Sequence, residues 1–228
     1  MGIYIKMAEY KIIDNEHRIG TVWKSYEEYK ILKDEPIDNI IKFYRKTRPH
    51  LDEELSYLSY KINDTKSKNI LSLGSGICIF EHMLKQHRPE INIYATDIIE
   101  EYIYHADKKY SDIHCDVFDM DKDDILEYIK KHKIDFIFTK SSLYALSYDS
   151  MLSFLYDIKK SDIKCMVIFF GGLKRRSKPA TAFTIGKQYG YAYSNREMKK
   201  IFKKLKIDYH IKNIGSYKYV YILKGDTN

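Results

Sequence analysis

The chain has 228 residues, of which 44% are hydrophobic, and it carries a formal net charge of +7. This length suits one sizeable α/β domain with a short appendage, and the hydrophobic share excludes general disorder. The longest apolar runs, IDFIF and MVIFF, have the size of core strands, so no membrane-spanning helix is expected.

The excess positive charge is unevenly distributed. Residues 169–228 contain 14 Lys and Arg against 3 Asp and Glu, while residues 69–168 are net acidic. This pattern favours an anionic partner or substrate group near the C-terminal third, or else a solvated lysine-rich face.

The first residues, MGIYIKMAEY, lack the basic and apolar regions of a secretory signal. The cysteines, Cys78, Cys115 and Cys165, form no C-x-x-C pair and lie in or beside expected strands. The sequence therefore predicts small buried thiols in a reducing cytoplasm. The spacing of the histidines and cysteines indicates no metal site.

Residues 1–68 read as helices, and we expect them to form an extension or lid to the domain that follows. One helix is expected at 24–33, near the only tryptophan, Trp23, and another at 36–46, which begins at Pro36. A third is expected at 51–62, where apolar residues share one face: Leu51, Leu55, Leu58 and Ile62.

From residue 69 onward, strand-like and helical stretches alternate. Strands are expected at 69–73, 91–96, 113–117, 134–139 and 164–170, with helices between them. A long irregular segment follows, and then a helix at 194–205 with a capping box of Ser194 and Glu197. The pattern predicts a seven-stranded, mostly parallel sheet that ends in an antiparallel hairpin at 207–224, with helices on both faces.

The first strand of this domain runs directly into a glycine pair, Gly74 and Gly76. In open α/β sheets, ligands bind at the carboxyl ends of the strands, and a helix N-terminus there favours an anionic group. Asp97 ends the second strand, where a carboxylate can accept both hydroxyls of a ribose. Asp116 ends the third strand and can meet an adenine amino group. A nicotinamide dinucleotide fold fits less well, because Ile79 occupies the position of its third glycine.

These motifs resemble those of the class I, Rossmann-like, S-adenosylmethionine-dependent methyltransferases over about residues 69–228. ILSLGSGI is similar to the family's glycine motif, TDI to its ribose-binding acid, CDV to its adenine-binding acid and IDFIFTKSSLYAL to its fourth-strand motif. The resemblance implies methyl transfer from S-adenosyl-L-methionine. It also implies a set of cofactor contacts: Leu73, Gly74, Ser75, Gly76, Asp97, Ile98, Asp116, Val117, Lys140 and Ser141.

Two residues depart from the family pattern. Ser72 stands where the family commonly has an acidic residue, and Cys78 stands where it has a glycine. Ser72 is expected to hold the cofactor's amino end less firmly, and Cys78 adds a Cβ near the loop.

The methyl acceptor is less constrained by the sequence. Motifs of exocyclic-nitrogen, cytosine C5 and ribose 2′-O methyltransferases are absent after the fourth strand, where Lys140 occupies the acidic position of the ribose enzymes. Tyr144 is a candidate for the acceptor site, as are Arg175 and Arg176 in the basic, aromatic segment 171–193.

We therefore expect methyl transfer to the oxygen or nitrogen of a small molecule, an anionic one among the candidates, with no catalytic base identified. An RNA methyltransferase that uses the basic third of the chain is one alternative. A binding protein that kept the fold but lost the cofactor is another, because of Ser72 and Cys78.

Overall fold

A computed structural model describes residues 10–11, 34–170, 182–185, 188–191 and 193–224. The main sheet has the strand order β4-β3-β2-β5-β6-β10-β9. Its strands are β2 (Asn69–Leu73), β3 (Asn92–Asp97), β4 (His114–Val117), β5 (Phe136–Lys140), β6 (Cys165–Phe170), β9 (Tyr209–Ile214) and β10 (Tyr217–Leu223). Strand β10 lies between β6 and β9 and is antiparallel to both, whereas β4, β3, β2, β5 and β6 are parallel. The predicted α/β class and seven-stranded sheet are confirmed.

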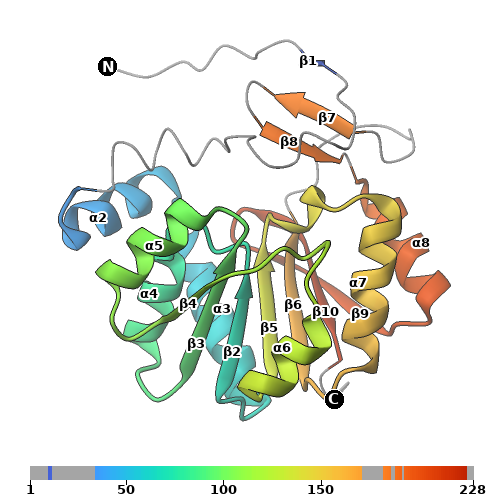
Figure 1. The fold of residues 1–228 in the computed structure, drawn as a ribbon, viewed down its shortest axis with the longest axis horizontal. Coiled ribbons are helices and arrows are strands. Elements are labelled where there is room, and N and C mark those ends of the chain that lie inside the picture. The colour runs from blue at the N-terminus through green and yellow to red at the C-terminus, as the bar shows by residue number, and fades with distance from the viewer. Residues whose placement is uncertain (1–9, 12–33, 171–181, 186–187, 192, 225–228) are drawn as a thin grey trace.

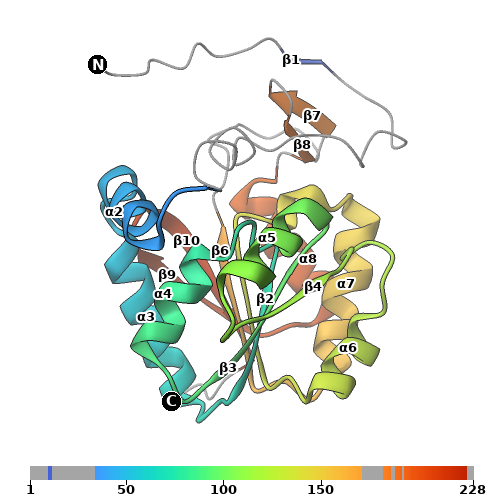
Figure 2. The same cartoon turned by 60° about the vertical axis from the view of Figure 1, so that its left-hand side comes forward.

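Helices cover both faces of this sheet (Figures 1 and 2). One face carries α2 (Ile37–Thr47), α3 (Leu51–Asp64), α4 (Ile79–His87) and α5 (Glu100–Lys109). The other carries α6 (Ile125–His132), α7 (Tyr148–Lys160) and α8 (Asn195–Leu205). Side chains alternate along each strand, so Ile70 packs under the first group and Leu71 under the second. Both faces are therefore buried, as expected of a parallel sheet.

Several local predictions are confirmed. The apolar stripe of α3 is fully buried, and Leu55, Leu58 and Ile62 are each 0% exposed. Helix α8 begins with the predicted capping box, in which the Ser194 side chain accepts from the Glu197 amide. The thiols of Cys78 and Cys165 are free and buried, and that of Cys115 is free and half-buried.

The segment after β6 differs from its prediction as an irregular connection. It contains β7 (Ala182–Ile185) and β8 (Gln188–Tyr191), which form a hairpin. Strand β7 also pairs with β1 (Tyr10–Lys11), which lies in the region expected to be helical. These strands were missed because two to four residues are too few to show a clear alternation. The hairpin lies beyond the carboxyl edge of the main sheet (Figures 1 and 2), and β8 packs against the 3-10 turn η2 (Leu143–Ala145).

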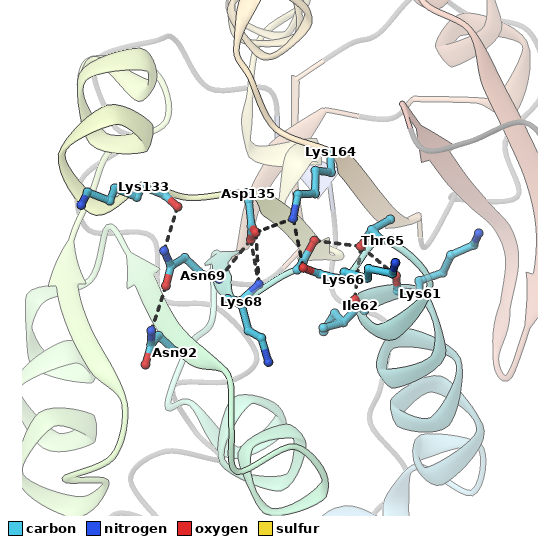
Figure 3. Close-up of polar contacts among 11 residues, drawn as sticks. Lys61, Ile62, Thr65, Lys66, Lys68, Asn69, Asn92, Lys133, Asp135 and Lys164 are labelled. Atoms are coloured by element: carbon cyan, nitrogen blue, oxygen red, sulfur yellow. Dashed lines mark hydrogen bonds and ion pairs between the residues drawn. The ribbon is translucent and has the colours of Figure 1, made fainter.

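The opposite, amino edge of the sheet is held by one carboxylate (Figure 3). Asp135 accepts the amides of Lys68 and Asn69 at 3.1 and 3.0 Å, and it pairs with the Lys164 ammonium at 3.0 Å. These contacts join the beginnings of β2, β5 and β6 to one another.

The buried side chains of helix α3 belong to the same core cluster as Ile70 of β2 and Phe138 of β5. The proposed boundary at residues 68 and 69, and the lid role of residues 1–68, stay predictions; the expected helix at 24–33 and Trp23 lie outside the described residues. Within the described ranges, every helix is too short or too polar to cross a bilayer.

Candidate functional site

The loop after β2 is built around residues with positive φ. Gly74 (φ +71°) and Gly76 (φ +60°) adopt left-handed conformations, and so does Cys78 (φ 56°), directly before α4. The amides of Gly74 and Ser75 donate to the carbonyl of Thr96 at 2.8 and 2.9 Å, which ties the loop to β3.

The two glycines meet different surroundings. A Cβ on Gly74 would lie 2.3 Å from the Cβ of Ser142, so this position accepts only glycine. A Cβ on Gly76 would meet nothing within 4 Å, so the backbone there faces open space. Gly76 is therefore the point of the loop that a ligand can approach closely.

Asp97, at the end of β3, is bonded directly to this loop. Its Oδ2 accepts the Gly76 amide at 2.9 Å, and its Oδ1 accepts the Ile99 amide at 3.0 Å. Burial raises the pKa of Asp97, although the amides of Ile99, Gly76 and Ile98 favour its charged form. A carboxylate has about four acceptor positions, so Asp97 retains capacity for further donors.

Two aliphatic side chains lie exposed beside Asp97 and Asp116. Ile98 is 37% exposed and Val117 is 50% exposed, both at the carboxyl edge of the sheet. Asp116 accepts a hydrogen bond from the Tyr128 hydroxyl of α6 at 2.7 Å through Oδ2. The predicted adenine-binding residues therefore lie together, with apolar surface available to a flat ring.

The end of β5 bears two predicted cofactor contacts with different surroundings. The Lys140 ammonium forms a buried ion pair with Glu54 of α3 at 2.7 Å, and it lies 4.2 Å from the centre of the Phe80 ring. Burial lowers the pKa of Lys140, and Glu54 opposes that shift. Ser141 (φ 57°) donates from its hydroxyl to the Tyr217 hydroxyl at 3.0 Å.

Of the predicted acceptor-site residues, Tyr144 lies in the part of the chain that the structure describes. Tyr144 lies half-buried on η2, and burial raises its pKa, with Tyr217 and Asp97 as further causes. Arg175 and Arg176 lie outside the described residues.

Sequence reasoning missed a buried polar group beneath the glycine loop. The Glu81 carboxylate of α4 accepts from the Ser72 hydroxyl at 2.6 Å, and Glu81 is 3% exposed. Glu54, Tyr128 and Tyr217 were missed as well, because each contacts a candidate site residue that lies on another helix or strand. A weak signal existed only for Glu81, which falls in the first helical turn after the loop. Across the described residues, no group of three or more His, Cys, Asp or Glu is arranged to hold a metal ion.

Comparison with known proteins gives a match in structure alone. Neither a protein-family model nor a curated protein sequence matches the chain significantly. DesVI of Streptomyces venezuelae superposes with a TM-score of 0.60 and 11% identity, over 82% of this chain and 97% of that one.

Two further solved structures are similar. CalS10 of Micromonospora echinaspora, an amino pentose methyltransferase solved with bound S-adenosylmethionine, gives a TM-score of 0.59 at 9% identity, over 90% of this chain and 98% of that one. A S-adenosylmethionine-dependent methyltransferase from Aquifex aeolicus gives 0.53 at 19% identity, over 83% of this chain and 97% of that one. At such identities the likeness establishes the architecture: the chain has the class I, Rossmann-like fold of the S-adenosylmethionine-dependent methyltransferases.

Proposed function

We propose that this protein is a methyltransferase that uses S-adenosyl-L-methionine. The observation that carries the proposal is the arrangement of Asp97, which is bonded to the amide of an open Gly76 beside the exposed Ile98 and Val117. A nucleoside needs all three features: a carboxylate for its hydroxyls, a bare backbone for close approach and apolar surface for its base.

Each residue has a proposed role toward the cofactor. Asp97 accepts the ribose hydroxyls with its remaining lone pairs, and Ile98 and Val117 pack against the adenine. The Tyr128 hydroxyl holds one oxygen of Asp116, which orients that carboxylate toward the adenine amino group. Leu73, Gly74, Ser75 and Gly76 border the methionyl part, as do the backbones of Lys140 and Ser141. When bound, S-adenosylmethionine supplies an electrophilic methyl group, so the chain's main task is to position the acceptor.

The acceptor is proposed to be a small molecule, methylated on oxygen or nitrogen. Two neighbours of the same fold support this class: CalS10 is an amino pentose methyltransferase, and ChlM of Synechocystis is a magnesium protoporphyrin IX methyltransferase. Tyr144, on the turn that follows β5, is proposed to line the acceptor site, and Arg175 and Arg176 are proposed to bind an anionic group of the substrate. The proposed compartment is the cytoplasm.

The proposal is tested by thermal-shift titration with S-adenosylmethionine, S-adenosylhomocysteine and NAD. A ligand at about 100 times its dissociation constant stabilises the folded state by about 2.7 kcal/mol, which corresponds to roughly 5–10 °C for a chain of this size. We expect that shift with both sulfur ligands in the wild type and in Asp107→Ala, whose side chain is exposed on α5. Asp97→Ala should abolish it.

Three other outcomes would each point to a different function. No shift with either sulfur ligand contradicts cofactor binding and favours a binding protein without catalysis. A shift with NAD alone would mean that the glycine loop belongs to a dinucleotide site. Tight RNA binding that weakens steeply with salt would favour the RNA substrate.

A further inference from the structure

The Glu81 carboxylate is buried and only half satisfied. Its Oε1 accepts the Ser72 hydroxyl at 2.6 Å, whereas its Oε2 is buried and has no hydrogen-bond partner among the described residues. Leaving a carboxylate oxygen buried without a donor carries a large penalty in free energy, so such an atom in a folded protein calls for an explanation.

The charges around Glu81 leave it without its own counter-ion. Lys140 of β5 is the cation whose charge acts on Glu81, but its ammonium is paired with Glu54 of α3 at 2.7 Å. Asp97 of β3 acts on Glu81 as a like charge. An ionised Glu81 therefore adds a negative charge that the described residues nearby do not balance.

The position of Glu81 relates this charge to the proposed ligand. Ser72, which holds Oε1, lies two residues before Gly74, and Glu81 lies in the first turn of the helix that follows the loop. The orphaned oxygen thus belongs to a carboxylate that joins the strand before the glycine loop to the helix after it, on the face of the sheet where Lys140 lies over Phe80.

We infer that the Glu81 carboxylate is the counter-charge for the ammonium at the amino-acid end of the bound cofactor. This inference rests on the proposed function and deepens it. It also gives a physical account of Ser72, which stands where the family that the sequence resembles commonly carries an acid: the carboxylate is supplied from the helix instead of the strand, and the serine hydroxyl holds it in place.

A proton competes with the cofactor for Glu81. Burial raises the pKa of Glu81 to about 7, against the lowering effects of the Ser72 hydroxyl, its own backbone amide and Lys140, and Asp97 raises it further. The other titratable groups around it are Cys78 in the loop and Tyr110 after α5, both neutral at this pH because their pKa values are raised. Cofactor binding requires the ionised form, so affinity should rise as pH increases through about 7.

The test compares two ligands that differ in the amino-acid end. S-adenosylhomocysteine carries the ammonium, and 5′-methylthioadenosine has the same nucleoside and thioether without it. By calorimetry, wild-type affinity for S-adenosylhomocysteine should rise about tenfold between pH 6 and 8, because the ionised share of a group titrating near 7 rises about tenfold over that range. Affinity for 5′-methylthioadenosine should lack this rise. Asp97 faces the nucleoside that both ligands share, so an effect of its titration appears with both ligands and cancels in their comparison.

The variant Glu81→Gln preserves size and the bond to Ser72 but removes the charge. At pH 8 it should bind S-adenosylhomocysteine about 10- to 100-fold more weakly than the wild type, as expected for loss of a charged hydrogen bond, and without the pH dependence. Its affinity for 5′-methylthioadenosine should equal that of the wild type, which also shows that the site is folded. Glu127→Gln, an exposed change on α6, should leave both affinities unchanged.

The outcomes separate the inference from the function beneath it. Equal S-adenosylhomocysteine affinity in the wild type and in Glu81→Gln, with 5′-methylthioadenosine bound by both, overturns the inference and leaves the proposed function standing. If the wild type binds neither ligand, the proposed function fails first.

Discussion

At the residue scale, Gly74 and Gly76 perform different tasks within one loop. Gly74 lies against Ser142, whose hydroxyl donates to the Leu73 carbonyl at 2.7 Å, so the contact joins the loop to the end of β5. Gly76 faces open space, so a Cβ there would meet no other atom within 4 Å, and only its φ of +60° disfavours other residues. The first glycine is required for packing and the second for ligand approach.

This difference predicts that the same substitution acts mainly on stability at Gly74 and mainly on ligand binding at Gly76. Gly74→Ala should reduce the free energy of unfolding by about 2–4 kcal/mol, because it combines overpacking with an unfavourable φ. Gly76→Ala should cost only about 1–2 kcal/mol for its φ, yet it should weaken S-adenosylhomocysteine binding by placing a methyl group on the loop. Urea unfolding and calorimetry on both variants measure these quantities. Equal stability of the two variants would contradict the geometry.

At the element scale, a buried polar junction holds three segments of the chain together. Glu54 of α3 pairs with Lys140 of β5 through Oε2, while its Oε1 accepts the amide and hydroxyl of Ser216 in the β9–β10 turn at 3.2 and 2.7 Å. At Gly215 of that turn, a Cβ would lie 2.7 Å from the Cγ of Glu54, so only glycine allows this approach.

Breaking this junction from one side should be costly. Glu54→Gln leaves a buried ammonium unpaired and should lower the free energy of unfolding by about 3 kcal/mol. In Glu54→Gln combined with Lys140→Met, the loss should be smaller than the sum of the two single losses by about 1–3 kcal/mol. Chemical denaturation of all three variants gives the coupling energy, and strict additivity would show that the pair contributes nothing.

A matched comparison is available in an exposed pair. Arg45 and Asp52 lie 3.3 Å apart with side chains 51% and 61% exposed. Asp52→Asn should change stability by less than about 1 kcal/mol, because solvent screens this pair. The contrast isolates burial as the cause of the larger effect at Glu54.

The regular elements were predictable from the sequence because each leaves a local signature. Residues a few positions apart predict the apolar stripe of α3 and the alternation of strands with helices from β2 to β6. They also predict the capping box of α8 and the terminal hairpin. The places of the candidate site residues Gly76, Asp97 and Asp116 were predictable because each follows or ends a strand. The bond from Tyr128 to Asp116, the pair of Glu54 with Lys140 and the orphaned oxygen of Glu81 were not predictable, because they depend on how whole elements pack.

At the scale of the whole molecule, the buried Glu81 makes stability depend on pH. Its pKa rises from an ordinary 4.5 to about 7 on folding, so between these values the folded state binds more protons than the unfolded state. The contribution of Glu81 to the free energy of unfolding is fully present below its unfolded-state pKa of 4.5, and it is lost as pH rises through about 7.

This shift predicts a measurable difference between two proteins. From pH 5 to pH 8, the wild type should lose about 2–3 kcal/mol of unfolding free energy relative to Glu81→Gln, since each unit of pKa shift corresponds to about 1.4 kcal/mol. Urea midpoints of both proteins at the two pH values give the difference, and other titrating groups cancel. A pair of parallel pH profiles would show that Glu81 keeps an ordinary pKa.

The position of β10 has a consequence for how the molecule folds. Strand β9 comes earlier in the sequence, yet its pairing partner in the sheet is β10, which separates it from β6. Strand β9 thus joins the sheet through β10, and the turn between the two strands brings Ser216 to Glu54 across 162 positions of sequence. Contacts of such long range form slowly, so the bond from Ser216 to Glu54 is expected to form late in folding, after β9 and β10 have paired across their short turn.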